Sequence, residues 1–178
     1  DEVLVYDEKG GFLRRFSAEG LDGTRGIVVA PDGRLYVASQ NSDEVFIFGP
    51  DETALSKFTH EQLDGPTGMA RGTNGVLYVC SFNNDQVLVF DLEGNYLRRF
   101  TGGGLDGPNC LALDSRGQIY VSSARTAEIV KFTAGERFVT SFTGGGLASP
   151  MSISRTPDDT LYVSGGASHN LVKFDTDG

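Results

Sequence analysis

A tandem repeat of 42 residues runs through the whole chain and constrains its fold more than any other feature. The tripeptide Leu-Asp-Gly begins at Leu21, Leu63 and Leu105, and a diverged copy, Leu-Ala-Ser, begins at Leu147. A Leu-Tyr-Val or Ile-Tyr-Val core recurs in the same register, at residues 35–37, 77–79, 119–121 and 161–163. Repeats of roughly 20 to 50 residues are typical of solenoids, propellers and similar arrays. We therefore expect a series of equal structural units.

Each repeat contains four short runs that are typical of β-strands. Examples are Gly26–Ala30, Leu35–Val37, Glu44–Phe48 and Phe12–Phe16, which are rich in β-branched and aromatic residues and lack a helical period. Tight turns such as Pro31–Gly33 join the first and second runs, with a glycine that supplies the positive φ of a hairpin. Four antiparallel strands in about 42 residues make one blade of a β-propeller. The predicted fold is all-β, a β-propeller of about four four-stranded antiparallel blades.

The repeat boundaries divide the chain into full and partial blades. Residues 1–20 are expected to hold the third and fourth strands of a first blade, and residues 147–178 the first three strands of a last one. Residues 21–62, 63–104 and 105–146 each hold a full blade. This division predicts an incomplete ring: either a fragment of a larger propeller, or a protomer that completes its circle by homo-oligomerisation.

Composition narrows the classes of function. The chain has 15 Lys and Arg against 24 Asp and Glu, a formal net charge of −9 and a pI of about 4.6. This balance disfavours nucleic-acid binding, which requires clustered cations. No apolar run approaches the roughly 18 residues of a membrane span, so no membrane partner is expected.

The chain begins with Asp1 instead of Met, which suggests a removed leader or a piece of a longer protein. An extracellular or periplasmic location is favoured over a cytoplasmic one.

The segment Asn74–Phe100 carries the most specific resemblance. It contains Gly75–Val79, with the sequence Gly-Val-Leu-Tyr-Val, followed by Phe90–Phe100, with the sequence Phe-Asp-Leu-Glu-Gly-Asn-Tyr-Leu-Arg-Arg-Phe. This pattern resembles the NHL-repeat β-propeller family, and more loosely the streptogramin lyase and gluconolactonase-like propellers. The resemblance implies the fold and says little of function, because the matching residues build the blade. NHL-like propellers commonly have six blades, which at this repeat length would need about 252 residues.

The segment after the Tyr-Val strand departs from the family pattern in three repeats. The acidic residue and glycine that usually follow the Tyr-Val strand are replaced by Ala38–Gln40, Cys80–Phe82 and Ser122–Ala124. Loop details known from the family are therefore not carried over to these positions.

Positions that differ between repeats are candidates for a ligand-binding face, because blade-building positions are shared. Such positions lie where the chain enters each first strand and where it joins the second and third strands. The candidates are Arg25, Thr67 and Asn109 at the first set of positions, where the last repeat has Met151, and Asn41, Asn83, Arg125 and His169 at or near the second set. Side chains of these types bind carboxylates, sugars or peptides. The alternative interpretation is ordinary divergence of solvated loops.

Catalytic and metal-binding roles depend on the family resemblance. Streptogramin lyases use a histidine on the propeller face as a base near a divalent ion, and His169 is the counterpart by loop position. Gluconolactonase-like propellers hold a divalent cation at the axis, which suggests Ca²⁺ or Mg²⁺ with Glu61, Asn83 and Asn109 as ligands. No zinc-type or calcium-loop motif occurs. His60, beside Glu61, is expected in a solvated loop.

Two further sets of residues have expected structural roles. The aspartates of Leu-Asp-Gly, Asp22, Asp64 and Asp106, are expected to brace the loops between blades by bonding backbone amides. Cys80 and Cys110 occupy positions that hold small residues in other repeats, so buried free thiols are expected.

Two functions remain open at this stage. The first is a binding or scaffold module that captures a peptide, a carbohydrate or a protein partner on its loop face. The second is a propeller enzyme of the lyase or lactonase type, with a divalent metal at the axis. Binding of a divalent ion would favour the enzyme.

Overall fold

Seventeen β-strands and no helix make up residues 1–178 in the computed structural model. The first sheet holds β1 (Val3–Tyr6) and β2 (Phe12–Phe16). The second holds β3 (Thr24–Val29), β4 (Leu35–Ser39), β5 (Glu44–Phe48) and β6 (Ala54–Phe58). The third holds β7 (Pro66–Arg71), β8 (Val76–Ser81), β9 (Gln86–Asp91) and β10 (Tyr96–Phe100). The fourth holds β11 (Pro108–Leu113), β12 (Ile119–Ser123), β13 (Glu128–Phe132) and β14 (Phe138–Phe142), and the fifth β15 (Pro150–Arg155), β16 (Leu161–Gly165) and β17 (Asn170–Phe174).

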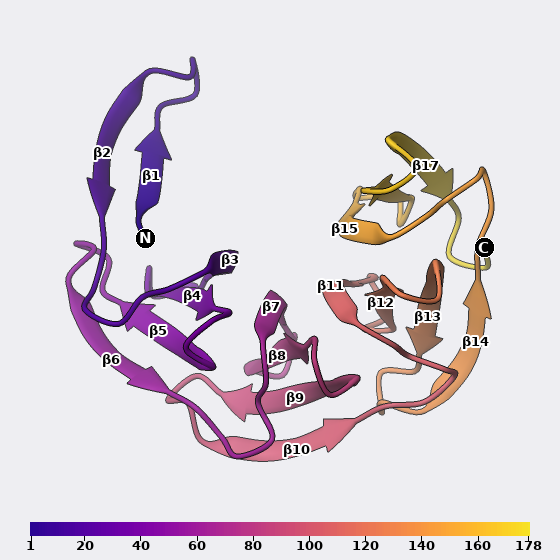
Figure 1. The fold of residues 1–178 in the computed structure, drawn as a ribbon, viewed down its shortest axis with the longest axis horizontal. Coiled ribbons are helices and arrows are strands. Elements are labelled where there is room, and N and C mark those ends of the chain that lie inside the picture. Colours follow the sequence, from indigo (N-terminus) through magenta and orange to yellow (C-terminus); the bar gives the residue numbers. More distant parts are fainter.

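The five sheets stand as blades around a common axis and form an open arc (Figure 1). Within each sheet, consecutive strands pair in antiparallel fashion. The strands β3, β7, β11 and β15 lie innermost, and β6, β10 and β14 lie on the outer rim (Figure 1). The β1–β2 sheet and the β15–β17 sheet stand apart at the two ends of the arc (Figure 1). The predicted all-β propeller of antiparallel blades is confirmed.

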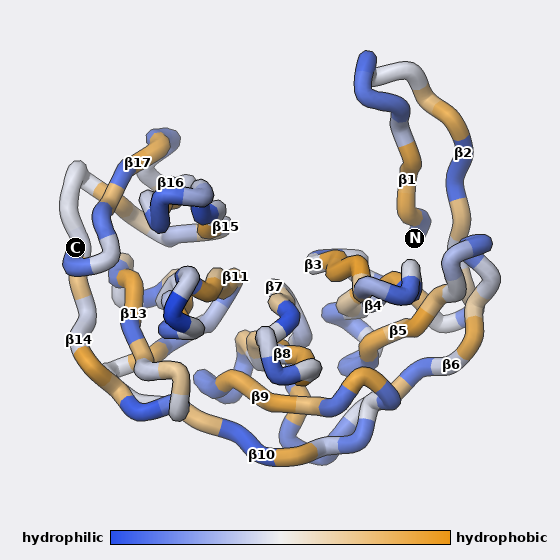
Figure 2. The backbone as a smooth tube through the Cα atoms, turned by 180° about the vertical axis from the view of Figure 1, so that it is seen from behind, coloured by the Kyte–Doolittle hydropathy of each residue, from blue (hydrophilic) through white to orange (hydrophobic).

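The middle strands of the three central blades are almost wholly buried, because neighbouring blades cover both of their faces. Every residue of β8 is buried, as are Val87–Phe90 of β9. Hydrophobic residues concentrate along such strands, whereas the turns are hydrophilic (Figure 2). Four apolar clusters each join two consecutive blades, so every interface within the arc has its own core. The fourth strands lie on the rim and are mostly exposed.

Near the axis the blades approach one another too closely for side chains at two positions. A Cβ atom on Gly26 would lie 2.5 Å from the carbonyl oxygen of Thr67 in the next blade. A Cβ atom on Gly68 would lie 2.6 Å from the Cα atom of Cys110. Glycine at these innermost positions therefore allows β3, β7 and β11 to pack side by side.

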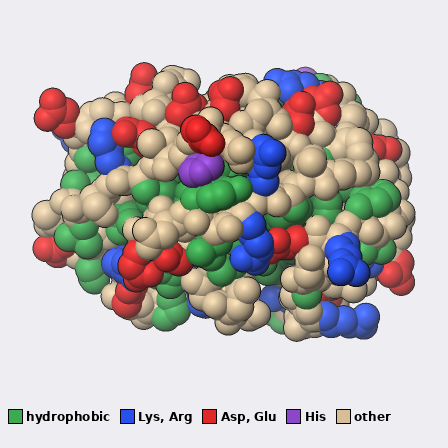
Figure 3. Space-filling model, turned by 90° about the horizontal axis from the view of Figure 1, so that it is seen from below, with side chains coloured by type: hydrophobic (Ala, Val, Ile, Leu, Met, Phe, Trp, Pro, Cys, Tyr) green, Lys and Arg blue, Asp and Glu red, His purple; other side chains and the backbone are tan.

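Ion pairs tie the rim of one blade to the next. Arg14 on β2 bonds Glu52 in the β5–β6 turn, with Nε 2.7 Å from Oε2. Arg98 on β10 bonds Glu136 in the β13–β14 turn, with Nε 2.8 Å from Oε2. The bonds from Arg14 hold the pKa of Glu52 below its usual range. Acidic and basic side chains alternate with exposed hydrophobic ones over this rim (Figure 3). Long cationic side chains on an outer strand also oppose edge-to-edge sheet pairing.

The structure contains no helix of the length and apolarity that a membrane span requires. Both cysteines are free; Cys80 is fully buried and Cys110 is partly exposed.

Candidate ligand-binding site at the propeller axis

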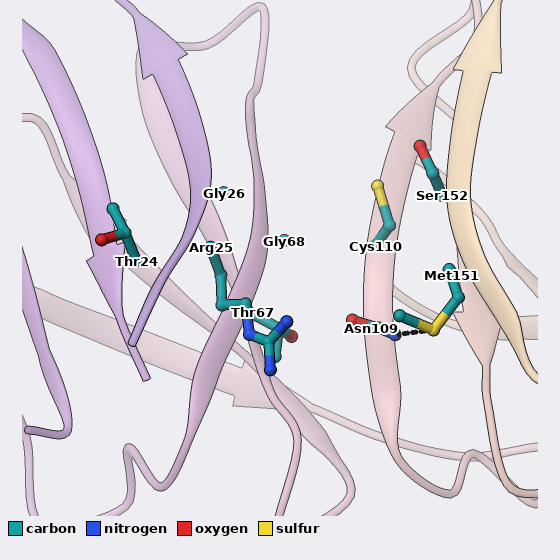
Figure 4. Close-up of a pocket in the computed structure, with 9 residues that line it drawn as sticks. All are labelled: Thr24, Arg25, Gly26, Thr67, Gly68, Asn109, Cys110, Met151 and Ser152. Carbon is teal, nitrogen blue, oxygen red and sulfur yellow. Dashed lines mark hydrogen bonds between the residues drawn. The ribbon is translucent and has the colours of Figure 1, made fainter. Parts of the chain in front are cut away.

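A cavity of about 350 Å³ opens on the inner wall of the arc, where the innermost strands begin. Its lining includes Arg25, Thr67, Asn109 and Met151, which are the second residues of β3, β7, β11 and β15. These positions are one repeat apart in the sequence. The propeller fold therefore brings them to one place, although their side chains are all different. Figure 4 shows Arg25 extending from β3 past Thr67 into this pocket, with Asn109 and Met151 on the other side.

A second cavity of about 210 Å³ shares these four residues, so the two form one continuous site, which we call the axial pocket. The second cavity adds Gln40, Phe82 and Ala124, which directly follow β4, β8 and β12. Sequence reasoning noted the unusual composition at these three positions and did not assign them to a site. The repeat alignment could have revealed them, because Gln40, Phe82 and Ala124 occupy equivalent positions and are three different residue types.

The charge of the axial pocket is opposite to that of the chain. None of the 24 acidic residues lines either cavity, and Arg25 is the one charged residue that does. Arg25 Nε donates a hydrogen bond to Gln40 Oε1 at 2.6 Å. The guanidinium forms no ion pair, so its terminal nitrogens carry an uncompensated charge at the pocket.

Two other lining residues differ in how available they are to a ligand. Thr67 is buried, and its hydroxyl donates to the carbonyl oxygen of Pro108 in the next blade at 3.0 Å. This hydroxyl therefore ties β7 to β11. The Asn109 Nδ2 atom lies 3.1 Å from Met151 Sδ, a weak acceptor, and the amide has no oxygen or nitrogen partner (Figure 4). Asn109 is thus free to exchange its sulfur contact for a stronger partner.

The loop residues Asn41, Asn83 and Arg125 lie outside the axial pocket. The Nδ2 atoms of Asn41 and Asn83 donate to Asp22 at 3.1 Å and Asp64 at 2.7 Å. An Arg125 terminal nitrogen donates to Asp106 at 3.0 Å, and its guanidinium covers the ring of Phe82 at 4.6 Å. Asn41 and Asn83 therefore brace loops within their own blades, whereas Arg125 also donates to Asp85 of the preceding blade at 3.2 Å.

The expectation that Asp22, Asp64 and Asp106 bond backbone amides is wrong, because their carboxylates accept from those loop side chains. Other aspartates bond the amides. Asp43 and Asp85 accept from Gly65 N at 2.7 Å and Gly107 N at 2.8 Å in the following blade. Asp1 accepts from Gly23 N in the same way. The repeat therefore contains two aspartate positions with separate roles, one within a blade and one between blades.

His169 occupies the position that Asp43 and Asp85 hold in earlier repeats. All three have left-handed backbone, with φ of 52° at His169, 56° at Asp43 and 60° at Asp85. His169 is exposed in the β16–β17 turn and does not line the axial pocket. His60 stacks on the ring of Tyr96, with centroids 3.8 Å apart, and its Nδ1 accepts from Gln62 N at 3.2 Å. The expected solvated loop at His60 is therefore packed on one side.

The three residues considered as metal ligands do not converge on one site. Asn109 lines the axial pocket, whereas the Asn83 amide is bonded to Asp64 and Glu61 lies in the loop before β7, outside the lining. The structure has no group of three or more His, Cys, Asp or Glu residues that could hold a metal ion. These residues do not fit a Ca²⁺ or Mg²⁺ site at the axis, because their oxygen atoms do not surround a common point.

Solved structures resemble this arrangement closely. A streptogramin B lyase structure aligns with a TM-score of 0.83 at 15% identity, over 99% of this chain and 59% of that one. A virginiamycin B lyase from Staphylococcus aureus aligns with 0.76 at 16% identity, over 98% and 62%. The WD40 β-propeller domain of Doa1 aligns with 0.76 at 18% identity, over 97% and 56%. The fold is a β-propeller.

Sequence identities between 15% and 18% show a shared fold and do not show a shared function. The chain spans between 56% and 62% of the length of these three solved chains. No model of a protein family matches the sequence, and no curated protein matches it. Membership of the NHL-repeat family therefore stays a prediction.

Proposed function

We propose that this propeller is a binding module, and that its axial pocket captures a peptide, a carbohydrate or a segment of a protein partner without chemical change. One observation carries the proposal. Four equivalent positions meet at one cavity and hold four different side chains, those of Arg25, Thr67, Asn109 and Met151. A purely structural role at equivalent positions favours similar residues, as at the buried serines that end β4, β8 and β12. Four different side chains suit a ligand that lacks the symmetry of the repeat.

The size and the lining of the axial pocket support binding of part of a larger molecule. A cavity of about 350 Å³ is at the small end of ligand sites, and it is continuous with the second cavity. Phe82 provides an aromatic wall there, and Arg25 and Asn109 provide polar groups. A few polar groups set in a concave surface give a ligand its orientation.

A lyase-type enzyme is the second candidate, and the likeness to streptogramin B lyase and virginiamycin B lyase favours it. This function would require a general base within reach of the bound ligand. His169 was the candidate base by loop position. His169 lies in the β16–β17 turn and outside the axial pocket, so this second candidate has less support than binding has.

The test is a binding screen by NMR line broadening, with short peptides and oligosaccharides as probes and the Ser152→Trp variant as the matched blocked protein. Ser152 is exposed on β15 and lines the pocket, so an indole there should fill the cavity without burying new polar groups. We expect a probe of one class to bind the unmodified protein and to lose its binding to the variant. The bound probe should be recovered with its mass unchanged.

The control is Ser154→Trp, which adds the same group two residues further along β15 and outside the pocket. This control should bind like the unmodified protein. A probe that binds Ser152→Trp equally well, or no binding by either class, would contradict the proposal. A probe recovered as a cleaved or eliminated product would favour the enzyme.

A further inference from the structure

We propose that the group recognised in the axial pocket is a carboxylate, held by the terminal nitrogens of Arg25, with Gln40 as the residue that positions the guanidinium. This inference rests on the proposed binding function and names the chemistry of its ligand. A carboxylate can come from the C-terminus of a peptide or from an acidic sugar. Both sources share the group that Arg25 would bind.

The first argument is the unpaired charge. Six of the ten other arginines form ion pairs with carboxylates of the chain, at distances between 2.5 and 3.5 Å: Arg14, Arg15, Arg34, Arg98, Arg125 and Arg155. Arg25 forms no ion pair, as is also true of Arg71, Arg99, Arg116 and Arg137, but Arg25 alone among the arginines lines the axial pocket. A guanidinium left without a carboxylate, in a cavity that no acidic residue lines, attracts an anion from solution.

The second argument is the orientation of the guanidinium. Its Nε atom is already bonded to Gln40 Oε1, which fixes the plane of the group. The two terminal nitrogens are then left as a planar pair, and a planar pair of donors matches the two oxygens of a carboxylate. Figure 4 shows this end of Arg25 in the pocket. A single positive charge in the lining also suits a singly charged anion better than a phosphate dianion.

The third argument is that Arg25 and Gln40 occur together in one repeat alone. In the later repeats, the positions equivalent to Arg25 and Gln40 hold Thr67 and Phe82, then Asn109 and Ala124, and finally Met151 and Gly166. Phe82, Ala124 and Gly166 have no side-chain acceptor. A side-chain acceptor for the arginine Nε atom therefore occurs only in the blade that has an arginine at the second position of its innermost strand.

Asn109 completes the proposed site from the opposite wall. Its amide contacts only the sulfur of Met151, so it can turn to donate to a carboxylate oxygen or to bond a neighbouring polar group of the ligand. The Phe82 ring provides an apolar surface for the part of the ligand next to the carboxylate. The site thus combines one ionic contact, one adaptable amide and one aromatic wall.

The test is calorimetric titration with two matched pairs of probes. N-acetylphenylalanine and its amide represent a peptide C-terminus, and glucuronate and glucose represent a sugar. We expect at least one acid to bind at least about tenfold more tightly than its neutral partner, in line with a charge-assisted contact. Preference within the first pair identifies a peptide end, and preference within the second identifies an acidic sugar. Higher salt should weaken binding of the acid.

Three variants separate the role of Arg25 from general effects of charge. Arg25→Ala should remove the preference for the acid. Arg71→Ala removes the same charge from β7, about 13 Å along the strand from Thr67 and outside the pocket, and should keep the preference. Gln40→Glu should abolish binding of the acid with Arg25 still present, because an internal carboxylate would occupy the guanidinium. A merely structural role of Gln40 would leave the ratio between acid and amide unchanged.

The outcomes distinguish this inference from the proposed function. Equal binding of acid and neutral probes, with sensitivity to Ser152→Trp, overturns the carboxylate and keeps the binding module. Retention of the acid preference in Arg25→Ala also overturns it. If neither acid binds at millimolar concentration, the inference fails, and the peptide and oligosaccharide screen alone decides the binding function.

Discussion

Equivalent residues in successive repeats separate structural side chains from candidate functional ones. Ser39, Ser81 and Ser123 end their strands fully buried, and each hydroxyl accepts from the backbone amide of the aspartate in the loop that enters the same blade, at 2.8 to 2.9 Å. The last repeat has Gly165 there, and Ser168 accepts from Ala148 N at 3.0 Å instead. The last repeat therefore keeps a serine hydroxyl as the acceptor for this amide, although the serine stands three residues further along the chain. By contrast, no interaction is shared among the four residues at the start of the innermost strands.

Cys80 is a buried residue whose titration can be predicted. Burial, followed by the nearby thiol of Cys110, raises the pKa of the Cys80 thiol well above its usual value. A group with a raised pKa in the folded state stabilises the fold below its unfolded pKa, about 8.5 for cysteine, and this stability is lost as the pH rises above that value. We expect the free energy of unfolding in urea to fall between pH 7.5 and about 9.5, below the range in which tyrosines titrate.

The Cys80→Ala variant is the control, since Ala38 fills the equivalent position in the preceding blade. It should show a flatter dependence of stability on pH over the same range. A slope equal to that of the unmodified protein would assign the effect to other groups.

At the scale of the elements, the blade interfaces follow two alternating patterns. The ion pairs of Arg14 with Glu52 and of Arg98 with Glu136 lie two repeats apart. At the other two interfaces, the hydroxyls of Tyr36 and Tyr120 donate to main-chain oxygens of the next blade, at 2.8 and 3.3 Å, and the ion pairs there are longer, at 3.6 and 3.4 Å. The structural unit of the rim is therefore a pair of blades, although the sequence repeat is a single blade.

Glu136 allows the backbone and side-chain contributions of one such contact to be separated. Its φ of 64° is left-handed, as is the φ of 67° at Glu52 two repeats earlier, whereas the repeats that begin one and three repeats earlier have Gly94 and Gly10 at the same position. Left-handed backbone costs about 1 kcal/mol for a residue other than glycine, and an ion pair whose arginine is partly exposed, as Arg98 is, contributes roughly 1 kcal/mol. In Glu136→Gly the two changes nearly cancel, so its stability should be close to that of the unmodified protein.

Glu136→Ala loses the ion pair and keeps the backbone strain, so it should be about 1 kcal/mol less stable than Glu136→Gly. Equilibrium unfolding in urea measures both. Ala134→Gly, in the same turn without a positive φ, is the control and should not be stabilising. If the alanine variant at position 136 equalled the glycine variant, the backbone would carry no strain there.

The elements were predictable from the sequence to a greater extent than the site. Phe12–Phe16 and Glu44–Phe48 are strands as predicted, because each strand type repeats with its own composition. The first strand begins at Thr24 and not at Gly26, since Thr24 pairs with Ser39 ahead of an irregularity in register. Partners between side chains were not predictable. The repeat places Arg25 near Gln40 only once the strands have paired, and no local pattern reveals that Asn83 is bonded to Asp64.

At the scale of the whole molecule, the arc behaves as a linear array in which each blade contacts its neighbours. Apolar side chains remain exposed on the end sheets, with Tyr6 52% and Phe12 56% exposed at one end and Leu171 67% exposed at the other. In arrays of this kind, stability is roughly the sum of unit and interface contributions. The central blade has two interfaces, whereas each end sheet has one.

Native-state hydrogen exchange should therefore give a gradient along the arc. We expect amides of β1–β2 and of β17 to exchange through local opening, well before those of β8 and β9, whose residues are almost all buried between two blades. A dilution series tests whether a second copy of the chain covers the end sheets. Protection of β1–β2 that rises with protein concentration would indicate association. Sedimentation at the same concentrations would report the mass of the species present. Uniform protection from β1 to β17 at every concentration would contradict the array, since it would require the two ends to be as well supported as the centre.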